Sequence, residues 1–571
     1  MQISGQMLLI IILQFSKMAY LRQKLALMKN LAILLLSSGI FLFLNCKQGQ
    51  KPPPTPQSDQ LGVLHFKYSG SETAMPHFEK GLKLLHNFEY EDACTEFKKA
   101  QEIDSSFVMA YWGEAMTYNH PLWRQQDYEK GQAALAKLAE TSAERQKLAQ
   151  SELEKDFIQS MEIMYGSDGN KKQRDSLYSK HLEQMYTKHK GDHEVAAFYA
   201  LSLLGAVKVG RDETAYEMGA RVAQGILDEN PNHPGALHYL IHSYDDPGHA
   251  SKALSAAFSY SKVAADATHA LHMPSHIFVA VGMWDEVVKS NIASWEASVE
   301  SVKRDTAAKN FGSYHALHWL MYGLLQKGRF DEAKQIMVDM KKYADEKPTE
   351  NARDYLISMK GNYLVETDDW DSEIADYQCD MEGLGLSVQA INQWIEGMKA
   401  YRKKDIEKLK SIVLTMQDDR KDAADKVTPE GIPMCSAAGA NRNAPNKQDI
   451  DQAYVMEMQL TALLTELEGN SPMGDKWLRR ASKWEMDMSY SYGPPVIVKP
   501  TFELHGEYFM NYGKFELAAK QFDKSLQKYP NRRRALMGRL NAAKSLNDEV
   551  KIKELETQLA EVLAPVQVES I

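Results

Sequence analysis

The sequence predicts an all-α protein built from repeated pairs of amphipathic helices. Three observations support this fold class. From residue 63 onward, apolar residues recur at helical spacing through most of the chain. The strict alternation of apolar and polar residues that marks strands is absent there, and so are Asn-Gly hairpin turns. Small and aromatic residues also recur with a period of 34 residues, which indicates a repeat architecture.

Composition and charge exclude several classes of protein. The chain has 571 residues, of which 44% are hydrophobic and 25% charged, as in ordinary globular proteins. The formal net charge of −10 disfavours binding along a phosphate backbone, so we expect no nucleic-acid partner. Four cysteines are too few for a disulfide framework. No apolar run reaches the roughly 18 to 20 residues that a membrane-spanning helix needs.

The N-terminal segment predicts export and anchoring at a bacterial cell envelope. An apolar run at residues 31–44 follows Lys29 and ends just before Cys46, so it resembles a lipoprotein signal and implies lipid attachment at Cys46. Phe43 and Asn45 depart from the usual signal box, which has Leu and a small residue at those places. An uncleaved anchor or a plain signal peptide, with Cys46 incidental, is therefore the alternative.

We accordingly divide the N-terminal region into a leader, residues 1–46, and a tether, residues 47–62. Met28 is a better start for the signal than Met1, because residues 1–27 add a second apolar run. The tether is polar and rich in proline, a composition that cannot bury apolar surface and that behaves as an extended linker.

A four-residue pattern recurs where one helix of a pair is expected to give way to the next. It consists of an aromatic residue, an acidic residue, a variable residue and a small or β-branched residue, at positions 90–93, 284–287, 330–333 and 515–518. Glycine precedes three of these patterns, at Gly282, Gly328 and Gly513, and Gly248 stands in the same relation to Ala253. Glycine there ends the first helix by adopting the left-handed conformation.

The spacing of the small residues identifies the repeat. Gly219, Ala253 and Val287 follow one another at intervals of 34 residues. Glycine stands twelve residues before the small residue of two patterns and phenylalanine four residues after it, as in Gly81-Ala93-Phe97 and Gly506-Ala518-Phe522. This pattern is that of the tetratricopeptide repeat, and the chain resembles bacterial proteins of that class.

The resemblance implies an α-solenoid whose first helices line a concave groove that binds a protein or peptide partner. We expect an N-terminal array at 63–345, and a C-terminal array at 346–571 whose repeats are more degenerate and which includes a surface loop at 428–449. Phosphate-binding loops, nucleophile elbows, Cys-x-x-Cys and His-Glu-x-x-His motifs are absent from the sequence, so a non-catalytic binding scaffold is the first expectation.

Histidines form a second pattern in the expected groove. Three successive repeats carry histidine, or tyrosine in its place, at matching positions of the first helix, where the side chains face the groove. The groove candidates are His238 with His242, His272 with His276, His318 with Tyr322, and the pair His269 and His315 at another matching position. Residues four apart share a helix face, so each His pair can bind one metal ion.

The metal hypothesis assigns His238, His242, His272, His276 and His318 as ligands of Zn²⁺, Mn²⁺ or Fe²⁺. Asp245 is placed to orient a ring or to complete the ligand set. Pro274, between His272 and His276, is expected to break or delay that helix and so to spoil the geometry of the pair.

Three interpretations of these histidines stay open on the sequence alone. They line the groove as hydrogen-bonded residues or contact an acidic peptide, they bind a metal, or they support catalysis at a metal. His120 is a further residue that can reach the same cavity.

Overall fold

The computed structural model describes residues 59–166, 169–208, 210–304, 310–428 and 444–565. The predicted leader with Cys46, residues 47–58 of the tether and residues 429–443 of the predicted surface loop lie outside these ranges. The described residues form an all-α solenoid of tetratricopeptide-type helix pairs, which confirms the predicted fold class. Strand structure in these residues is limited to β1 (Asn119–His120) and β2 (Gln125–Gln126), which pair antiparallel.

The first part of the array contains helix pairs and one short additional helix. These elements are α2 (Met75–His86) with α3 (Tyr90–Ile103), α4 (Val108–Met116) with α5 (Tyr128–Leu138), α6 (Ser142–Leu148), α7 (Glu152–Met164) with α8 (Lys171–Lys188), and α9 (His193–Gly205) with α10 (Glu213–Glu229).

The middle of the array contains the helices that carry the predicted histidine pattern. They are α11 (Pro234–Ser243), the 3-10 helix η1 (Ala250–Ala253), α12 (Leu254–Val263), α13 (Thr268–His272), α14 (Pro274–Val281), α15 (Trp284–Arg304), α16 (Tyr314–Gln326), α17 (Phe330–Glu346), α18 (Glu350–Thr367) and the 3-10 helix η2 (Glu373–Asp376).

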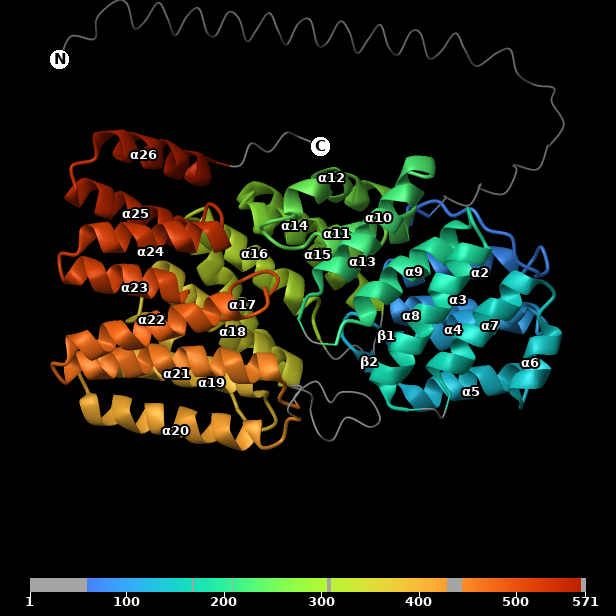
Figure 1. The fold of residues 1–571 in the computed structure, drawn as a ribbon, viewed down its shortest axis with the longest axis horizontal. Coiled ribbons are helices and arrows are strands. Elements are labelled where there is room, and N and C mark those ends of the chain that lie inside the picture. Colours follow the sequence, from blue (N-terminus) through green and yellow to red (C-terminus); the bar gives the residue numbers. More distant parts are fainter. Residues whose placement is uncertain (1–58, 167–168, 209, 305–309, 429–443, 566–571) are drawn as a thin grey trace, which may run out of the picture. The chain divides into compact units, whose positions relative to one another are not determined.

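The last part continues as regular pairs. They are α19 (Leu386–Arg402) with α20 (Ile406–Ala424), α21 (Lys447–Leu467) with α22 (Ser471–Asp487), α23 (Thr501–Asn511) with α24 (Phe515–Lys528), and α25 (Arg533–Ser545) with α26 (Glu549–Leu563). Helices α20 to α26 each contact the next one along the chain (Figure 1). Because α21 begins at Lys447, the end of the predicted loop 428–449 is helical. The predicted division into arrays 63–345 and 346–571 stays a prediction.

Aromatic residues fit between glycines of neighbouring first helices, and this contact sets the repeat spacing. A Cβ atom added at Gly81 would lie 2.9 Å from the Phe97 ring, and one added at Gly113 of the next repeat would lie 2.4 Å from it. The last two repeats do the same, with Phe522 against Gly506 at 2.7 Å and Gly538 at 2.3 Å. Glycine is required at these positions because any side chain would overlap the ring.

We expect Gly506→Ala to lower the free energy of unfolding by about 1 to 3 kcal/mol, because the added methyl group must displace the buried Phe522 ring. Gly225→Ala is the matched control. Gly225 also lies within a helix, but nothing stands within 4 Å of its added Cβ atom, so alanine should stabilise the protein by about 0.5 to 1 kcal/mol. Urea unfolding measures both, and equal effects would show that the Phe522 contact is unimportant.

The predicted turn glycines behave as expected at three positions and differently at one. Gly282, Gly328 and Gly513 have φ of 72°, 69° and 65° and end their helices in the left-handed conformation. Gly248 is not among the residues with positive φ, so its predicted role is wrong. Its N–H donates to Asp246 Oδ1 at 2.9 Å, and the following helix begins as the 3-10 turn η1.

The last repeats pack against the middle of the array. Trp284 Nε1 donates to the carbonyl oxygen of Asn531 at 2.9 Å, and Asn531 Nδ2 donates to the carbonyl oxygen of Gly282 at 3.3 Å. Leu536 and Leu555 belong to the same hydrophobic cluster as α2 to α15. Within the described ranges, every helix is too short or too polar to span a bilayer.

Candidate metal centre and its pocket

The predicted histidines lie on the first helices of three successive repeats. Pro234 occupies the first position of α11, where a backbone N–H would have no acceptor within the helix, so its lack of an N–H is no loss. The His233 side chain caps the helix by accepting a hydrogen bond from the Ala236 N–H, and together these two residues fix the start of α11. His238 and His242 follow one turn apart on α11. His272 ends α13, His276 lies in α14, and His315 lies in α16.

The expected break at Pro274 does not separate His272 from His276. Met273 has helical φ and ψ of −54° and −35°, so the chain passes from α13 to α14 without leaving the helical conformation. Pro274 occupies the first turn of α14, where its missing N–H is no loss. The Nε2 atoms of His272 and His276 consequently lie 3.1 Å apart, and the prediction that proline spoils this pair is wrong.

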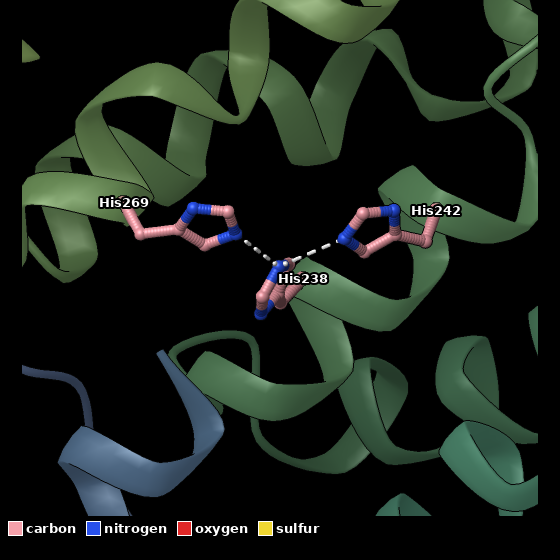
Figure 2. A group of neighbouring side chains, drawn as sticks. All are labelled: His238, His242 and His269. Carbon is pink, nitrogen blue, oxygen red and sulfur yellow. Dashed lines mark hydrogen bonds between the residues drawn. The ribbon is translucent and has the colours of Figure 1, made fainter. Parts of the chain in front are cut away.

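Three imidazoles converge in the first group, which consists of His238, His242 and His269 (Figure 2). His238 Nε2 lies 3.1 Å from His242 Nε2 and 3.2 Å from His269 Nε2. On its other side, His238 Nδ1 donates to the carbonyl oxygen of His86 at 2.7 Å. This bond places the Nδ1 proton, so the neutral His238 ring presents a lone pair at Nε2, toward the other two rings.

The second group consists of His272, His276 and His315. His272 Nδ1 donates to Asn291 Oδ1 at 2.7 Å, and His276 Nδ1 donates to Asp245 Oδ2. Asn291 Nδ2 is engaged with the carbonyl oxygen of Val287 at 2.8 Å, so its oxygen must face His272. His315 Nδ1 lies 3.1 Å from the Tyr355 hydroxyl.

These hydrogen bonds fix the protonation of the second group. An amide oxygen and a carboxylate only accept, so both His272 and His276 carry their proton on Nδ1 when neutral. Their Nε2 lone pairs then face each other across 3.1 Å. Two facing lone pairs repel, and either a proton or a metal cation between the rings removes the repulsion.

Burial disfavours a proton on four of the six rings. Loss of hydration lowers the pKa of His238, His242, His269 and His272 well below the usual value, and repulsion from neighbouring imidazoles lowers these pKa values further. These four rings are therefore neutral at pH 7. Neutral imidazole is the form that binds transition metals.

The two groups form one continuous cluster of six imidazoles. The ring centroids of His242 and His276 are 5.8 Å apart, and those of His269 and His272 are 6.3 Å apart. Asp245, 1% exposed, holds His276 through Oδ2, while its Oδ1 atom has no hydrogen-bond partner among the described residues. A buried carboxylate oxygen without a donor is costly, and a nearby cation compensates for it.

Other predicted residues lie outside both groups, and for His318 this contradicts its assignment as a metal ligand. His318 Nε2 is 2.6 Å from Asn362 Oδ1, and its pKa is lowered by burial to about 4. The Tyr322 hydroxyl accepts a hydrogen bond from Arg532 Nη1 at 2.5 Å. His120 stacks on Tyr90 with ring centroids 4.0 Å apart and borders the same cavity as His269, His272 and His315, which confirms that it reaches this cavity. The structure thus places His315, one turn before His318, among the converging rings.

A further His/Glu group, which the sequence pattern did not reveal, is saturated by hydrogen bonds. His86 Nε2 and His233 Nε2 contact the two oxygens of Glu194 at 2.7 and 3.2 Å, and His86 Nδ1 contacts the Tyr239 hydroxyl at 2.8 Å. Burial raises the Glu194 pKa, but the two histidines outweigh this effect and lower it to about 2. Because the fourth ring nitrogen, His233 Nδ1, caps α11, no lone pair is left for a metal.

A cavity of about 1020 Å³ adjoins the histidine cluster and is bordered by His269, His272 and His315. Residues 489–492 from the segment between α22 and α23 also line it. The Tyr492 ring centroid lies 6.0 Å from that of His276, and Gly493 lies directly against Trp319. The chain itself therefore fills part of the groove that the sequence assigned to a partner.

No protein-family model matches the chain, and no curated protein matches it. Solved structures with a similar fold include the Cut9–Hcn1 hetero-tetramer of the APC/C (11% identity, 87% of this chain and 80% of that chain, TM-score 0.38). Others are yeast Tom70 (12%, 85% and 99%, TM-score 0.31) and the human IFIT1 dimer with m7Gppp-AAAA (12%, 88% and 92%, TM-score 0.30). These similarities concern the helical-repeat fold alone.

Proposed function

We propose that the protein is a helical-repeat binding protein that holds divalent transition metal ions on the concave side of its repeats, one ion in each three-histidine group. The observation that carries this proposal is the fixed proton on Nδ1 of both His272 and His276, which leaves two lone pairs facing each other at 3.1 Å. In the first group His238 alone has its Nδ1 proton fixed, and its Nε2 lone pair faces Nε2 of His242 and of His269.

The distances between nitrogen atoms suit a metal of this class. Zinc binds imidazole nitrogen at 2.0 to 2.1 Å, so two nitrogens of a tetrahedral site lie about 3.3 to 3.4 Å apart. The separations of 3.1 and 3.2 Å between these nitrogen atoms need only a small adjustment. Imidazole ligands suit zinc and iron, with manganese a weaker candidate, and three protein ligands leave a coordination position for a further ligand.

The neighbours of the rings support the same function. Metal-bound histidines characteristically donate their second nitrogen to a carbonyl or a carboxylate, which fixes the ring and raises its basicity. The His86 carbonyl does this for His238, Asn291 for His272 and Asp245 for His276. These three rings thus hold the orientation that a metal requires before any ion binds.

Thermal unfolding in the presence of metal tests the proposal. An ion that binds only the folded state at one hundred times its Kd stabilises the protein by about 2.7 kcal/mol, so Zn²⁺, Mn²⁺ or Fe²⁺ should raise the Tm. The double variant His238→Ala/His242→Ala should lose part of this rise, and the further pair His272→Ala/His276→Ala should abolish the rest. His77→Ala/His181→Ala, outside both groups, is the control. A Tm unmoved by all three metals would contradict the proposal.

A second candidate function is the binding of a protein or peptide partner on the concave side. It is supported by the repeat architecture, in which first helices of successive repeats lie side by side, as α2 does with α4 and α23 with α25. Affinity capture from envelope extract tests it. Trp123 is an exposed residue in the cavity wall. If the wild type captures a protein that Trp123→Ala does not, partner binding is supported, and unchanged capture by Trp123→Ala would oppose it.

The cellular location that we propose is the bacterial envelope, with attachment through lipid on Cys46. The apolar run before Cys46 and the proline-rich tether after it support this location. Cys46→Ser should release the protein from the membrane fraction. Mass spectrometry that finds membrane-bound protein with an unmodified Cys46 would contradict the assignment.

A further inference from the structure

The cavity beside the histidine cluster has a basic wall in an acidic protein. The chain carries a net charge of −10, yet six cationic side chains and only two carboxylates border the cavity. The cations are Arg124, Lys171, Lys172, Lys208, Arg211 and Lys447, and the carboxylates are Glu89 and Asp175. A local excess of cations raises the local concentration of anions.

Half of these cations have no ion-pair partner in the part of the chain that the structure describes. Lys171 is paired with Asp175 at 2.7 Å, Arg211 with Asp246 at 3.1 Å, and Lys447 with Asp451. Arg124, Lys172 and Lys208 make no ion pair with any described residue. The remaining carboxyl, Glu89, accepts a hydrogen bond from the His269 backbone N–H at Oε1, 2.9 Å away. The wall is therefore left with uncompensated positive charge.

An exposed aromatic side chain stands beside these cations. Trp123 is 48% exposed, although it borders the cavity and lies next to Arg124 in the sequence. The Trp123 ring makes T-shaped contacts with Phe88, with ring centroids 5.4 Å apart, and with Tyr90, at 6.2 Å. The neighbours fix the ring, and a flat group can stack on the surface left uncovered.

We infer that this cavity binds a small anion joined to a planar ring, a ligand of the aryl phosphate or aryl carboxylate class. The anionic group lies against Arg124 and Lys172, and the ring stacks on Trp123. A volume of about 1020 Å³ is ample for such a ligand. Because His269, His272 and His315 border the same cavity, the anion also comes near the open coordination positions. Only this last contact rests on the proposed metal centre.

Isothermal titration of the full chain with phenylphosphonate, a stable aryl anion, tests the inference. Benzyl alcohol, which has the ring without the charge, and inorganic phosphate, which has the charge without the ring, are titrated in parallel. Arg124→Gln/Lys172→Gln removes the two cations. Lys262→Gln/Lys520→Gln removes the same charge from two exposed lysines outside the cavity wall. Trp123→Ala removes the stacking surface.

We expect saturable binding of phenylphosphonate by the wild type and by the Lys262/Lys520 control. Affinity should fall at least about tenfold in Arg124→Gln/Lys172→Gln, since two charge-assisted contacts are lost, and several-fold in Trp123→Ala. The inference would be overturned if the wild type did not bind phenylphosphonate, or if benzyl alcohol bound equally well. It would also be overturned if Arg124→Gln/Lys172→Gln bound phenylphosphonate with unchanged affinity.

Metal analysis of the same samples keeps the two proposals apart. Phenylphosphonate binding that depends on Arg124 and Lys172 supports the anion site whether or not the sample contains metal. If the purified protein contains no metal and no added metal raises its Tm, only the proposed metal centre is contradicted. Tighter binding by metal-loaded protein than by chelator-treated protein would support the contact between the anion and the metal, and equal binding would overturn that contact alone.

Discussion

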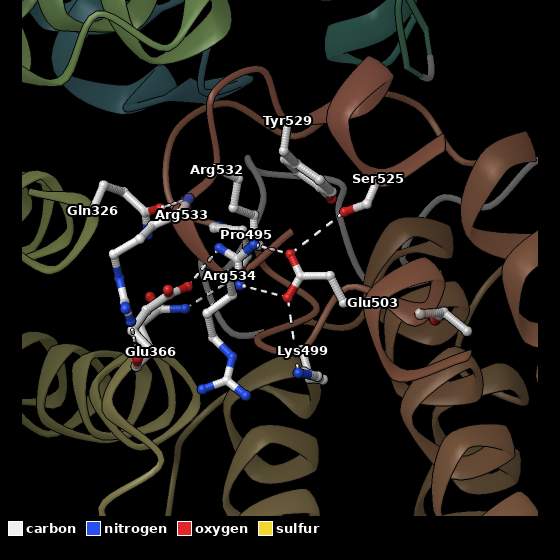
Figure 3. A network of polar contacts seen from close by, with 12 residues as sticks. Gln326, Glu366, Pro495, Lys499, Glu503, Ser525, Tyr529, Arg532, Arg533 and Arg534 are labelled. Atoms are coloured by element: carbon white, nitrogen blue, oxygen red, sulfur yellow. Dashed lines mark hydrogen bonds and ion pairs between the residues drawn. The ribbon is translucent and has the colours of Figure 1, made fainter. Parts of the chain in front are cut away.

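Arg532→Met is expected to lower the free energy of unfolding by about 3 to 5 kcal/mol. Arg532 is fully buried between two buried carboxylates, Glu366 and Glu503, and pairs with Glu366 at 2.6 Å (Figure 3). The guanidinium also donates to the Tyr322 hydroxyl. Methionine fills a similar volume but leaves the buried Glu366 carboxylate without its cation and Glu503 with Lys499 alone, 3.8 Å away. Chemical unfolding followed by circular dichroism measures the loss.

Two comparison variants separate lost charge pairing from lost packing. Arg480→Met removes an exposed arginine and should change stability by less than about 0.5 kcal/mol. Adding Glu503→Gln to Arg532→Met should restore part of the stability, because one of the stranded charges is removed. The free energy lost in Glu503→Gln alone is the reference. If adding Glu503→Gln to Arg532→Met lowered the free energy of unfolding by that same amount, the two residues would not be coupled.

The second large effect concerns metal stoichiometry. With two three-histidine groups, we expect the wild type to bind two zinc ions and His272→Ala/His276→Ala to bind one, because two of three ligands of the second group are removed. His238→Ala/His242→Ala should likewise retain one ion. Protons compete for the same lone pairs, but burial lowers the pKa of His238, His242, His269 and His272 well below the usual value, so affinity should persist at pH ~6.5 and fall only at clearly lower pH. Equilibrium dialysis with elemental analysis measures both quantities.

Asp245→Asn distinguishes metal binding from general destabilisation. Asparagine keeps an oxygen that can accept from His276 Nδ1 but removes the negative charge, so the fold should persist while zinc affinity falls by about 10- to 100-fold. Metal-free wild type and Asp245→Asn should have similar circular dichroism spectra. Retention of two tightly bound ions by all of the histidine variants would mean that zinc binds elsewhere.

Local sequence signals predicted the fold well because each repeat is built from short-range contacts. The 34-residue period located Gly81, Phe97, Gly506 and Phe522 at the helix crossings where the structure places them. Gly248 misled because a segment anchored by the Asp246 side chain, and not a left-handed residue, leads into the next helix there. The 34-residue pattern contains no information on this alternative way of entering a helix.

The site was only partly predictable because it depends on helix rotation. Residues three apart on a helix differ by about 60° around its axis, so a small rotation of α16 decides whether His315 or His318 meets His272. The structure places His315 there, with ring centroids 4.5 Å apart. Sequence periodicity does not fix a rotation to that accuracy.

Long-range contacts account for what the sequence did not reveal. His86 meets Glu194 across 108 positions of the chain, and Arg532 meets Tyr322 across 210. The segment that carries Tyr492 lines the cavity although it lies more than 200 residues after His276. No periodic pattern encodes such pairings, since each depends on how the repeats stack.

Anomalous X-ray scattering at the zinc absorption edge, from crystals of the zinc-loaded protein, tests the metal centre most directly. We predict one strong peak among the Nε2 atoms of His238, His242 and His269, and a second among the rings of His272, His276 and His315. A well-ordered map with no anomalous peak at either group, and with only water or direct hydrogen bonds between the rings, would contradict it.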